Sequence, residues 1–230
     1  MSKYVEAIFK NRPNRFIAEV EIKGKIVKAH VPNTGRCKEL LIPGVKVYLL
    51  PSDNPKRKTK YSLRYVDNKG FLVDIYSQQA NEIVFNAIKD GLIKEFSTYT
   101  VFEREKTVDD SRIDIYLSGS DSENDCFVEV KGVTLIKDGL AQFPDAPTKR
   151  GCKHLKELIT LKGKGYRTAV FFLVQHPAGN KFMPNWENDP EFSNILKEAI
   201  DKGVEIIIYK SVNTLNGSYI EGNSLKYVLD

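Results

Sequence analysis

The sequence predicts a two-domain protein of mixed α+β and α/β class, with a small five-stranded β-barrel over residues 1–78 and a mixed sheet flanked by helices over residues 79–230. Residues 15–76 contain five short β-branched or aromatic runs separated by Gly, Pro and Asn turns. From residue 79, apolar residues recur at helical spacing, and helices then alternate with strands. Because such alternation favours a sheet covered by helices, the architecture is expected to change near residue 78.

The predicted barrel has the strand number of the oligonucleotide/oligosaccharide-binding (OB) fold, which binds nucleic acid on one sheet face. Its predicted strands are residues 15–22, 25–31, 45–50, 61–66 and 71–76. A loop between two of them carries Lys56, Arg57, Lys58 and Lys60. Tyr61, Tyr65 and Phe71 are either stacking platforms for bases or core residues.

Charge is distributed unevenly along the chain. Residues 1–78 contain 16 Lys and Arg against seven Asp and Glu, net +9, whereas residues 79–230 contain 19 against 23, net −4. A basic surface on a small domain favours a polyanionic partner, most often nucleic acid, although lysines also simply solvate a surface.

The second part reads as helices and strands in the order αβββαβαβ. The predicted helices are residues 79–90, residues 148–162 and a helix that starts with Asp189-Pro190 and ends at Gly203. The predicted strands are residues 98–104, 111–117, 126–133, 168–175 and 204–209.

Strands 111–117 and 126–131 predict a hairpin with a polar face formed by Asp114, Glu129 and Lys131. A hairpin that is symmetric about its loop predicts the pairs Ile113–Val130, Ile115–Val128, Leu117–Cys126 and Asp114–Glu129. Two opposed carboxylates repel each other, and a bridging divalent cation relieves that repulsion. We therefore predict that Asp114 and Glu129 hold Mg²⁺ or Mn²⁺ beside a catalytic Lys131. The alternative is an ordinary surface ion pair.

A second basic segment enters the helix over residues 148–162. It carries Lys149, Arg150, Lys153 and His154. Free backbone N–H groups at the start of a helix, together with these side chains, favour a bound phosphate. The alternatives are a capped helix with a solvated basic face and a structural histidine.

Three cysteines without zinc-like spacing indicate free thiols, and neither a signal peptide nor a membrane span is evident. We expect a cytoplasmic protein that does not contact membranes.

Four motifs in order resemble the sugar fermentation stimulation protein (SfsA) family. They are residues 30–37 (HVPNTGRC), 111–114 (SRID), 128–131 (VEVK) and 143–155 (FPDAPTKRGCKHL). The resemblance implies an OB-like domain, a PD-(D/E)XK nuclease-like domain and DNA binding without sequence specificity. Asp114 matches the acidic residue of the nuclease motif, and Glu129-Val130-Lys131 matches its (D/E)XK part. Arg36 and Arg112 within these motifs are further predicted DNA contacts.

One departure concerns the first helix of the nuclease-like domain. The family pattern has a glutamate there, where this chain is expected to have Asn86, with Glu82 one turn away. Loss of a third metal-facing carboxylate leaves open whether the chain is an enzyme.

Three functions remain open. The first is a Mg²⁺- or Mn²⁺-dependent DNA nuclease, and the second is a non-catalytic DNA-binding regulator of sugar metabolism that retains the nuclease scaffold. The third, a protein that binds a small sugar or sugar phosphate, is favoured only by the family name. Strand preference and oligomeric state are not determined by the sequence.

Overall fold

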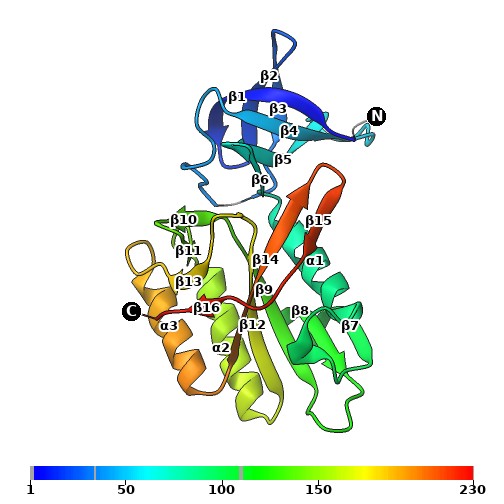
Figure 1. Ribbon diagram of the computed structural model, residues 1–230, viewed down its shortest axis with the longest axis vertical. Helices are drawn as coiled ribbons and strands as arrows, with labels where there is room; N and C mark the ends of the chain where they lie inside the picture. The colour runs from blue at the N-terminus through cyan, green and yellow to red at the C-terminus, as the bar shows by residue number, and fades with distance from the viewer. Residues whose placement is uncertain (1–2, 34, 109–110, 230) are drawn as a thin grey trace.

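A computed structural model describes residues 3–33, 35–108 and 111–229. The barrel sits on one end of a larger sheet that is covered by helices on both faces (Figure 1). Within the described residues, none of the helices combines the length and apolar character needed to cross a membrane.

The amino-terminal part is an OB-like five-stranded barrel, as predicted. Its strands are β1 (Val5–Asn14), β2 (Ile17–Ile22), β3 (Lys25–His30), β4 (Lys46–Pro51) and β5 (Tyr61–Asn68), and β6 (Phe71–Asp74) extends the sheet. The order β3-β2-β1-β4-β5 is closed by parallel pairing of β3 with β5. The predicted strand list lacks β1, although Ala7 and Phe9 are buried there. Closure therefore depends on a strand that the sequence analysis missed.

The second part is built on a curled, mixed six-stranded sheet. Its order is β15-β14-β12-β9-β8-β7, and β12 is parallel to both neighbours. The strands are β7 (Val101–Val108), β8 (Ser111–Ser118), β9 (Cys126–Val133), β12 (Arg167–Val174), β14 (Glu205–Thr214) and β15 (Gly217–Ile220). Asp189 caps the last helix, as predicted, and a proline follows at its first position.

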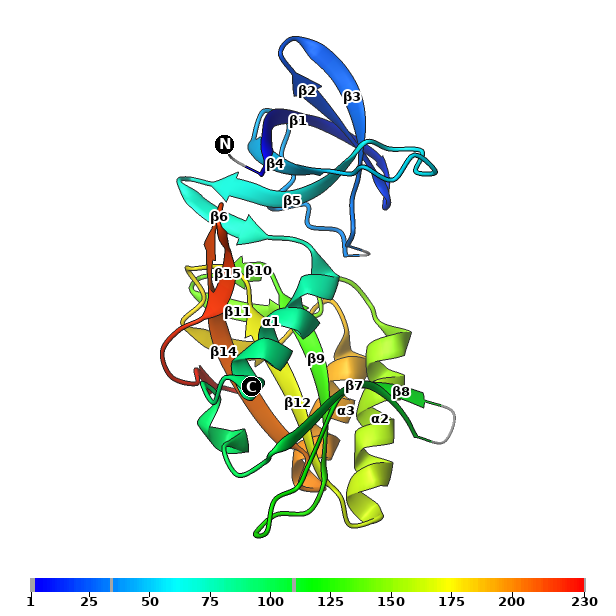
Figure 2. The same cartoon turned by 90° about the vertical axis from the view of Figure 1, so that its right-hand side faces the viewer.

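Helices cover both faces of this sheet (Figure 2). The helices are α1 (Ser77–Lys89), a single 3-10 turn η1 (Lys94–Phe96), α2 (Lys149–Gly163) and α3 (Pro190–Asp201). A small second sheet, β10-β11-β13-β16, was not predicted. Its strands are β10 (Leu135–Lys137), β11 (Leu140–Phe143), β13 (Lys181–Pro184) and β16 (Lys226–Tyr227).

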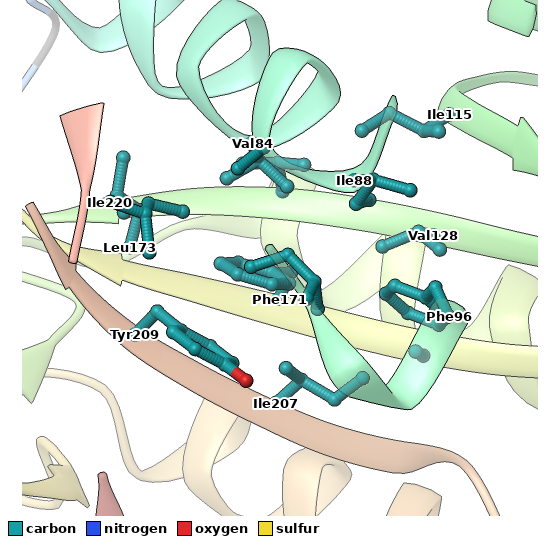
Figure 3. Packing of buried hydrophobic residues seen from close by; sticks show 14 of the residues in the cluster. Val84, Ile88, Phe96, Ile115, Val128, Phe171, Leu173, Ile207, Tyr209 and Ile220 are labelled. Carbon is teal, nitrogen blue, oxygen red and sulfur yellow. The ribbon is translucent and has the colours of Figure 1, made fainter. Parts of the chain in front are cut away.

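The two faces of the main sheet belong to separate apolar cores. Between the sheet and α1, Val84 and Ile88 pack over Val128 and Phe171, and Phe171 stacks on Tyr209 with ring centroids 5.6 Å apart (Figure 3). Leu155 and Leu158 of α2 and Phe192 of α3 pack on the opposite face. The three helices are thus held firmly on the sheet that positions the predicted site.

Polar contacts fasten the barrel to the sheet. Buried Arg64 of β5 pairs with Asp74 at 2.7 Å, and its second terminal nitrogen donates to Gln79 of α1 at 2.8 Å. The Tyr65 hydroxyl bonds to Ser218 of β15 at 3.0 Å. Burial, although opposed by Arg64, raises the pKa of Asp74 to about 6.

Candidate active site

The predicted hairpin forms, but its strands separate at the polar residues. Ile115 pairs with Val128 and Leu117 with Cys126, as predicted. The ladder ends there, so the predicted pairs Ile113–Val130 and Asp114–Glu129 do not form. Glu105 of β7, at the level of Asp114, has φ of 56° and leaves extended geometry. Ile113 accordingly packs in the α2 core, whereas Ile115 packs in the α1 core.

The side chain of Asp114 replaces the backbone hydrogen bond that is missing between β8 and β9 at this level. Its Oδ2 accepts a hydrogen bond of 2.8 Å from the backbone N–H of Val130, and its Oδ1 accepts one of 2.6 Å from the side chain of Asn81 on α1. Burial, reinforced by the charge of Glu129, raises the pKa of Asp114 to about 6. The carboxylate is thus fixed where added positive charge is favourable.

Glu129 is buried between Lys131 and His154. Its Oε1 accepts from Lys131 Nζ at 2.5 Å and from His154 Nδ1. Arg150 Nε donates to His154 Nε2 at 3.2 Å, which places the histidine proton on Nδ1, facing the glutamate. Burial favours a raised pKa for Glu129, but the Lys131 charge and the His154 bond outweigh it and lower the pKa below its usual value. Glu129 is therefore an oriented, charged acceptor.

One carboxylate oxygen in this cluster has no hydrogen-bond partner. Glu129 Oε2 is buried and unpaired within the described part of the chain. An unpaired buried carboxylate oxygen is costly, and Mg²⁺ binds through one or two carboxylates plus water and substrate. The described residues hold no group of three or more His, Cys, Asp or Glu suited to a metal. The observation that fits a cation here is the buried, unpaired oxygen of Glu129, with Asp114 as the neighbouring carboxylate.

The first helix presents an amide, not a carboxylate, to this site. Asn81 contacts Asp114, and Gln78 lines the same cavity. Asn86 and Glu82, where the family pattern placed the helix contribution, line a different groove beside β15. Asn86 was expected at the site, but Asn81 faces Asp114 there instead.

The start of α2 is set by a hydrogen-bond network that runs through Thr148 at the cavity wall. Thr148 Oγ1 accepts from Gly151 N at 3.0 Å, and Asp189 accepts from Thr148 N at 2.7 Å. The same Asp189 carboxylate accepts from Phe192 N at 2.9 Å in α3. One carboxylate thus fixes the first turns of both helices.

The cavity is lined by the carboxyl-terminal half of β9 and by Gln175, which directly follows β12. The carboxyl ends of these two parallel strands point towards the barrel (Figure 2). The cavity has a volume of about 330 Å³. Asp114, Glu129, Lys131, Arg150 and His154 of the predicted site residues line it. Because α1 and α2 both begin at this end, their amide dipoles favour an anion there.

The other predicted contacts lie outside the cavity. They are Arg36, Lys56, Arg57, Lys58, Lys60, Arg112, Lys149 and Lys153. Most are exposed on the surface, whereas Arg57 is half-buried and donates to Ser62 at 2.8 Å. Of the aromatic residues near the basic loop, Tyr65 is buried, Tyr61 packs on the barrel core and Phe71 is exposed. Stacking on Tyr65 is thereby excluded.

Several cavity residues were missed by the sequence analysis. They are Asn33, Gln78, Asn81, Gln142, Asp145 and Gln175. Asp145 stands in the quoted Phe143-to-Leu155 motif between two prolines, a signal that could have identified it. The other side chains carry no charge and follow no catalytic spacing, so only the fold brings them together.

Comparison with known proteins supports the architecture. Residues 11–75 match the SfsA N-terminal OB domain, and residues 78–217 match the sugar fermentation stimulation protein RE domain. A sugar fermentation stimulation protein homolog of Methanobrevibacter smithii is 63% identical over 98% of each chain. A homolog of the same description from a Thermoanaerobacter species is 50% identical over 87% of each.

A solved structure, that of Pyrococcus furiosus SfsA in complex with Ca²⁺, superposes with a TM-score of 0.89. The two proteins are 32% identical, and the alignment covers 99% of this chain and 97% of that one. With both domains matched in order and the whole chain superposed, the protein belongs to the sugar fermentation stimulation protein (SfsA) family.

Proposed function

We propose that the chain is a DNA-binding protein whose cavity is a divalent-metal-dependent phosphodiesterase site. The observation that carries this proposal is the convergence of Asp114, Glu129 and Lys131 on one cavity, with Glu129 Oε2 buried and unpaired. Groups of this kind accept a cation and stabilise the charge that develops on a phosphate during hydrolysis.

Asp114 and Glu129 would hold Mg²⁺ or Mn²⁺. When bound, the ion would polarise a phosphate oxygen and acidify a coordinated water. The Ca²⁺ complex of the Pyrococcus furiosus relative supports a divalent ion in this family, because Ca²⁺ and Mg²⁺ both take oxygen ligands. Cleavage assays in Mg²⁺ and in Mn²⁺ distinguish the two ions.

The residues of the chain have separate tasks in this proposal. Lys131 Nζ, 2.5 Å from Glu129, orients the attacking water or neutralises charge that builds on the phosphate. His154 holds Glu129 through Oε1, which keeps Oε2 turned to the cation. Arg150 at the cavity wall and Lys149 beside it attract the phosphate backbone.

The barrel would supply most of the DNA affinity. Its +9 charge and its exposed Lys56, Lys58 and Lys60 favour contacts with phosphates, which carry no sequence information. We accordingly assign residues 1–78 as the nucleic-acid-binding domain and residues 79–230 as the nuclease-like domain. The domain matches above, to residues 11–75 and 78–217, support this division.

One observation favours a non-catalytic regulator instead. Asn81, an amide, faces the site from α1, so among the described residues α1 adds no carboxylate to Asp114 and Glu129 there. A site with fewer charged ligands binds the ion less tightly. Under this alternative the scaffold binds DNA without turnover.

The deciding experiment incubates the purified protein with labelled single- and double-stranded DNA in Mg²⁺, Mn²⁺ or EDTA. Glu129→Ala and Lys131→Ala are assayed in parallel, with Lys197→Ala on the exposed face of α3 as control. We expect metal-dependent cleavage by the parent and control, and none by the two site variants. Absence of cleavage, or equal cleavage by Glu129→Ala and Lys131→Ala, would exclude the nuclease and leave the regulator.

A further inference from the structure

Gln175 is a buried polar residue of the cavity that has no role in the proposed chemistry. Its side chain is 1% exposed, lines the cavity, and carries an Nε2 without a hydrogen-bond partner in the described parts of the chain. Native proteins rarely leave a buried amide donor unpaired, because the loss of hydration is costly. The unpaired donor indicates that a ligand acceptor belongs beside it.

The fold holds Gln175 in this position from two sides. Its backbone N–H donates to Val133 O at 2.8 Å at the end of β9, and its carbonyl accepts from Asn213 Nδ2 at 2.9 Å. The side chain then lies over Gly132, where any Cβ would clash with Gln175 Oε1. The glycine directly after Lys131 thus makes room for the carboxamide beside the proposed catalytic groups.

The cavity has neutral and apolar lining residues besides its charged ones. Gln142 and Phe143 of β11 and Leu135 of β10 line it together with Gln175. Its positive charges include Lys131 and Arg150, and both contact His154 of α2. A glutamine presents a donor and an acceptor together, the pattern that matches the edge of a nucleobase, whereas phosphate is matched by the cationic side chains.

The barrel closes the cavity from above. Asn33 and Gly35 line it, and the adjoining Cys37 N–H donates to Asp145 Oδ2 at 3.2 Å. A Cβ on Gly35 would clash with the same carboxylate, so the two loops are in contact. The space of about 330 Å³ is at the lower end of the range for small-ligand pockets, ~300–1,000 Å³. A base inside a paired, stacked duplex does not fit such a space.

We propose that the part of the cavity around Gln175 is a subsite for the base of an unpaired nucleotide, with Gln175 Nε2 donating to the base and Gln142 as a further polar group of the cavity lining. The subsite rests on the proposed function only in placing the nucleotide next to Lys131. It predicts that the chain engages single-stranded or flipped-out nucleotides there, not a closed duplex.

The test compares Gln175→Met with the parent in Ca²⁺ buffer, with binding measured by fluorescence anisotropy and so independent of cleavage. The probes are a single-stranded oligonucleotide, a strand of the same length made of abasic residues, and the matched duplex. We expect Gln175→Met to bind the single strand about tenfold more weakly and to bind the abasic strand and the duplex like the parent. Asn194→Leu on α3 is the control and should change none of them.

Thermal unfolding separates this role from a structural one. Methionine has a similar shape and removes the unpaired donor, so the Tm of Gln175→Met should equal or exceed that of the parent. Equal weakening on all three probes together with a lower Tm, or unchanged binding of the single strand, would overturn the subsite. Failure of the parent to cleave DNA would refute the nuclease and leave this binding result standing.

Discussion

The carboxylate of Asp114 and the backbone N–H of Val130 are joined by a 2.8 Å hydrogen bond, so a side chain from β8 completes the edge of β9. The residue that would bind the cation is therefore also part of the sheet. Val130 lies between Glu129 and Lys131 in the sequence, so the same hydrogen bond fixes the positions of Asp114, Glu129 and Lys131 along the two strands. Variants at this site therefore change its geometry as well as its charge.

We expect Lys131→Met to destabilise the fold. It leaves Glu129 charged, buried and paired with His154 alone, and loss of one partner of a buried pair costs about 3–5 kcal/mol. Adding Glu129→Gln removes the stranded charge and should recover much of that loss. Urea unfolding of both single variants and the double variant measures this coupling, and strictly additive free energies would contradict it.

We expect His154→Ala to weaken divalent-metal binding about 10–100-fold, the usual effect of losing the partner that orients a ligand. The imidazole holds Glu129 Oε1 on one side and Arg150 on the other. Isothermal titration with Mg²⁺, Mn²⁺ and Ca²⁺ measures the change. Lys153→Ala is the matched control, because this exposed residue of α2 pairs with Glu157 and not with Glu129 among the described residues. Equal affinities of His154→Ala and the parent would show that Glu129 needs no such support.

Charge reversal of Lys56 and Lys58 should weaken DNA binding and flatten its salt dependence. Each lost phosphate contact lowers the slope of log K against log salt by about 0.9 for duplex DNA. Both side chains are exposed on the loop between β4 and β5, so the Tm should not change. Reversal of Lys197 and Lys226, exposed elsewhere, is the control. An unchanged slope would remove this loop from the DNA-binding surface.

Stability should respond to pH through His176. Burial lowers the pKa of this ring, whose Nδ1 accepts from Ala178 N at 3.1 Å and whose Nε2 contacts Asn68 of the barrel at 2.8 Å. The unfolded chain therefore takes up a proton that the folded chain does not, and stability is lost as pH falls below about 6.5.

His176→Gln should reduce this loss between pH 7.5 and 5.5 in urea unfolding. The comparison is made as a difference between variant and parent, because buried Asp74, with its pKa raised to about 6, contributes the opposite slope in both. Parallel curves for the two proteins would assign the acid sensitivity to another group.

The sequence predicted much of the scaffold because its signals are local. The symmetry of the hairpin about its loop predicted the Ile115–Val128 register, and Asp189-Pro190 marked the start of α3. Strand β1 was missed although Ala7 and Phe9 alternate inward, because Pro13 and the basic residues near it weaken the strand pattern.

The site depended on contacts that no local signal carries. The apolar stripe of α1 is predicted by Ile83, Val84 and Ala87, but which edge of the stripe meets the hairpin depends on docking. Docking selected Asn81, not Asn86. His154 was predicted to contact phosphate, yet its burial against Glu129 follows from the packing of α2 on the sheet.

Asp189 does not line the cavity, but it fixes a helix that carries two of the lining residues. Its two oxygens accept from Thr148 at the start of α2 and from Phe192 at the start of α3. Because α2 carries Arg150 and His154, the orientation of both side chains depends on Asp189, the N-cap of α3. If the proposed function holds, a mutational scan scored by activity would rank Asp189 with the cavity residues, although Asp189 is not one of the residues that line the cavity.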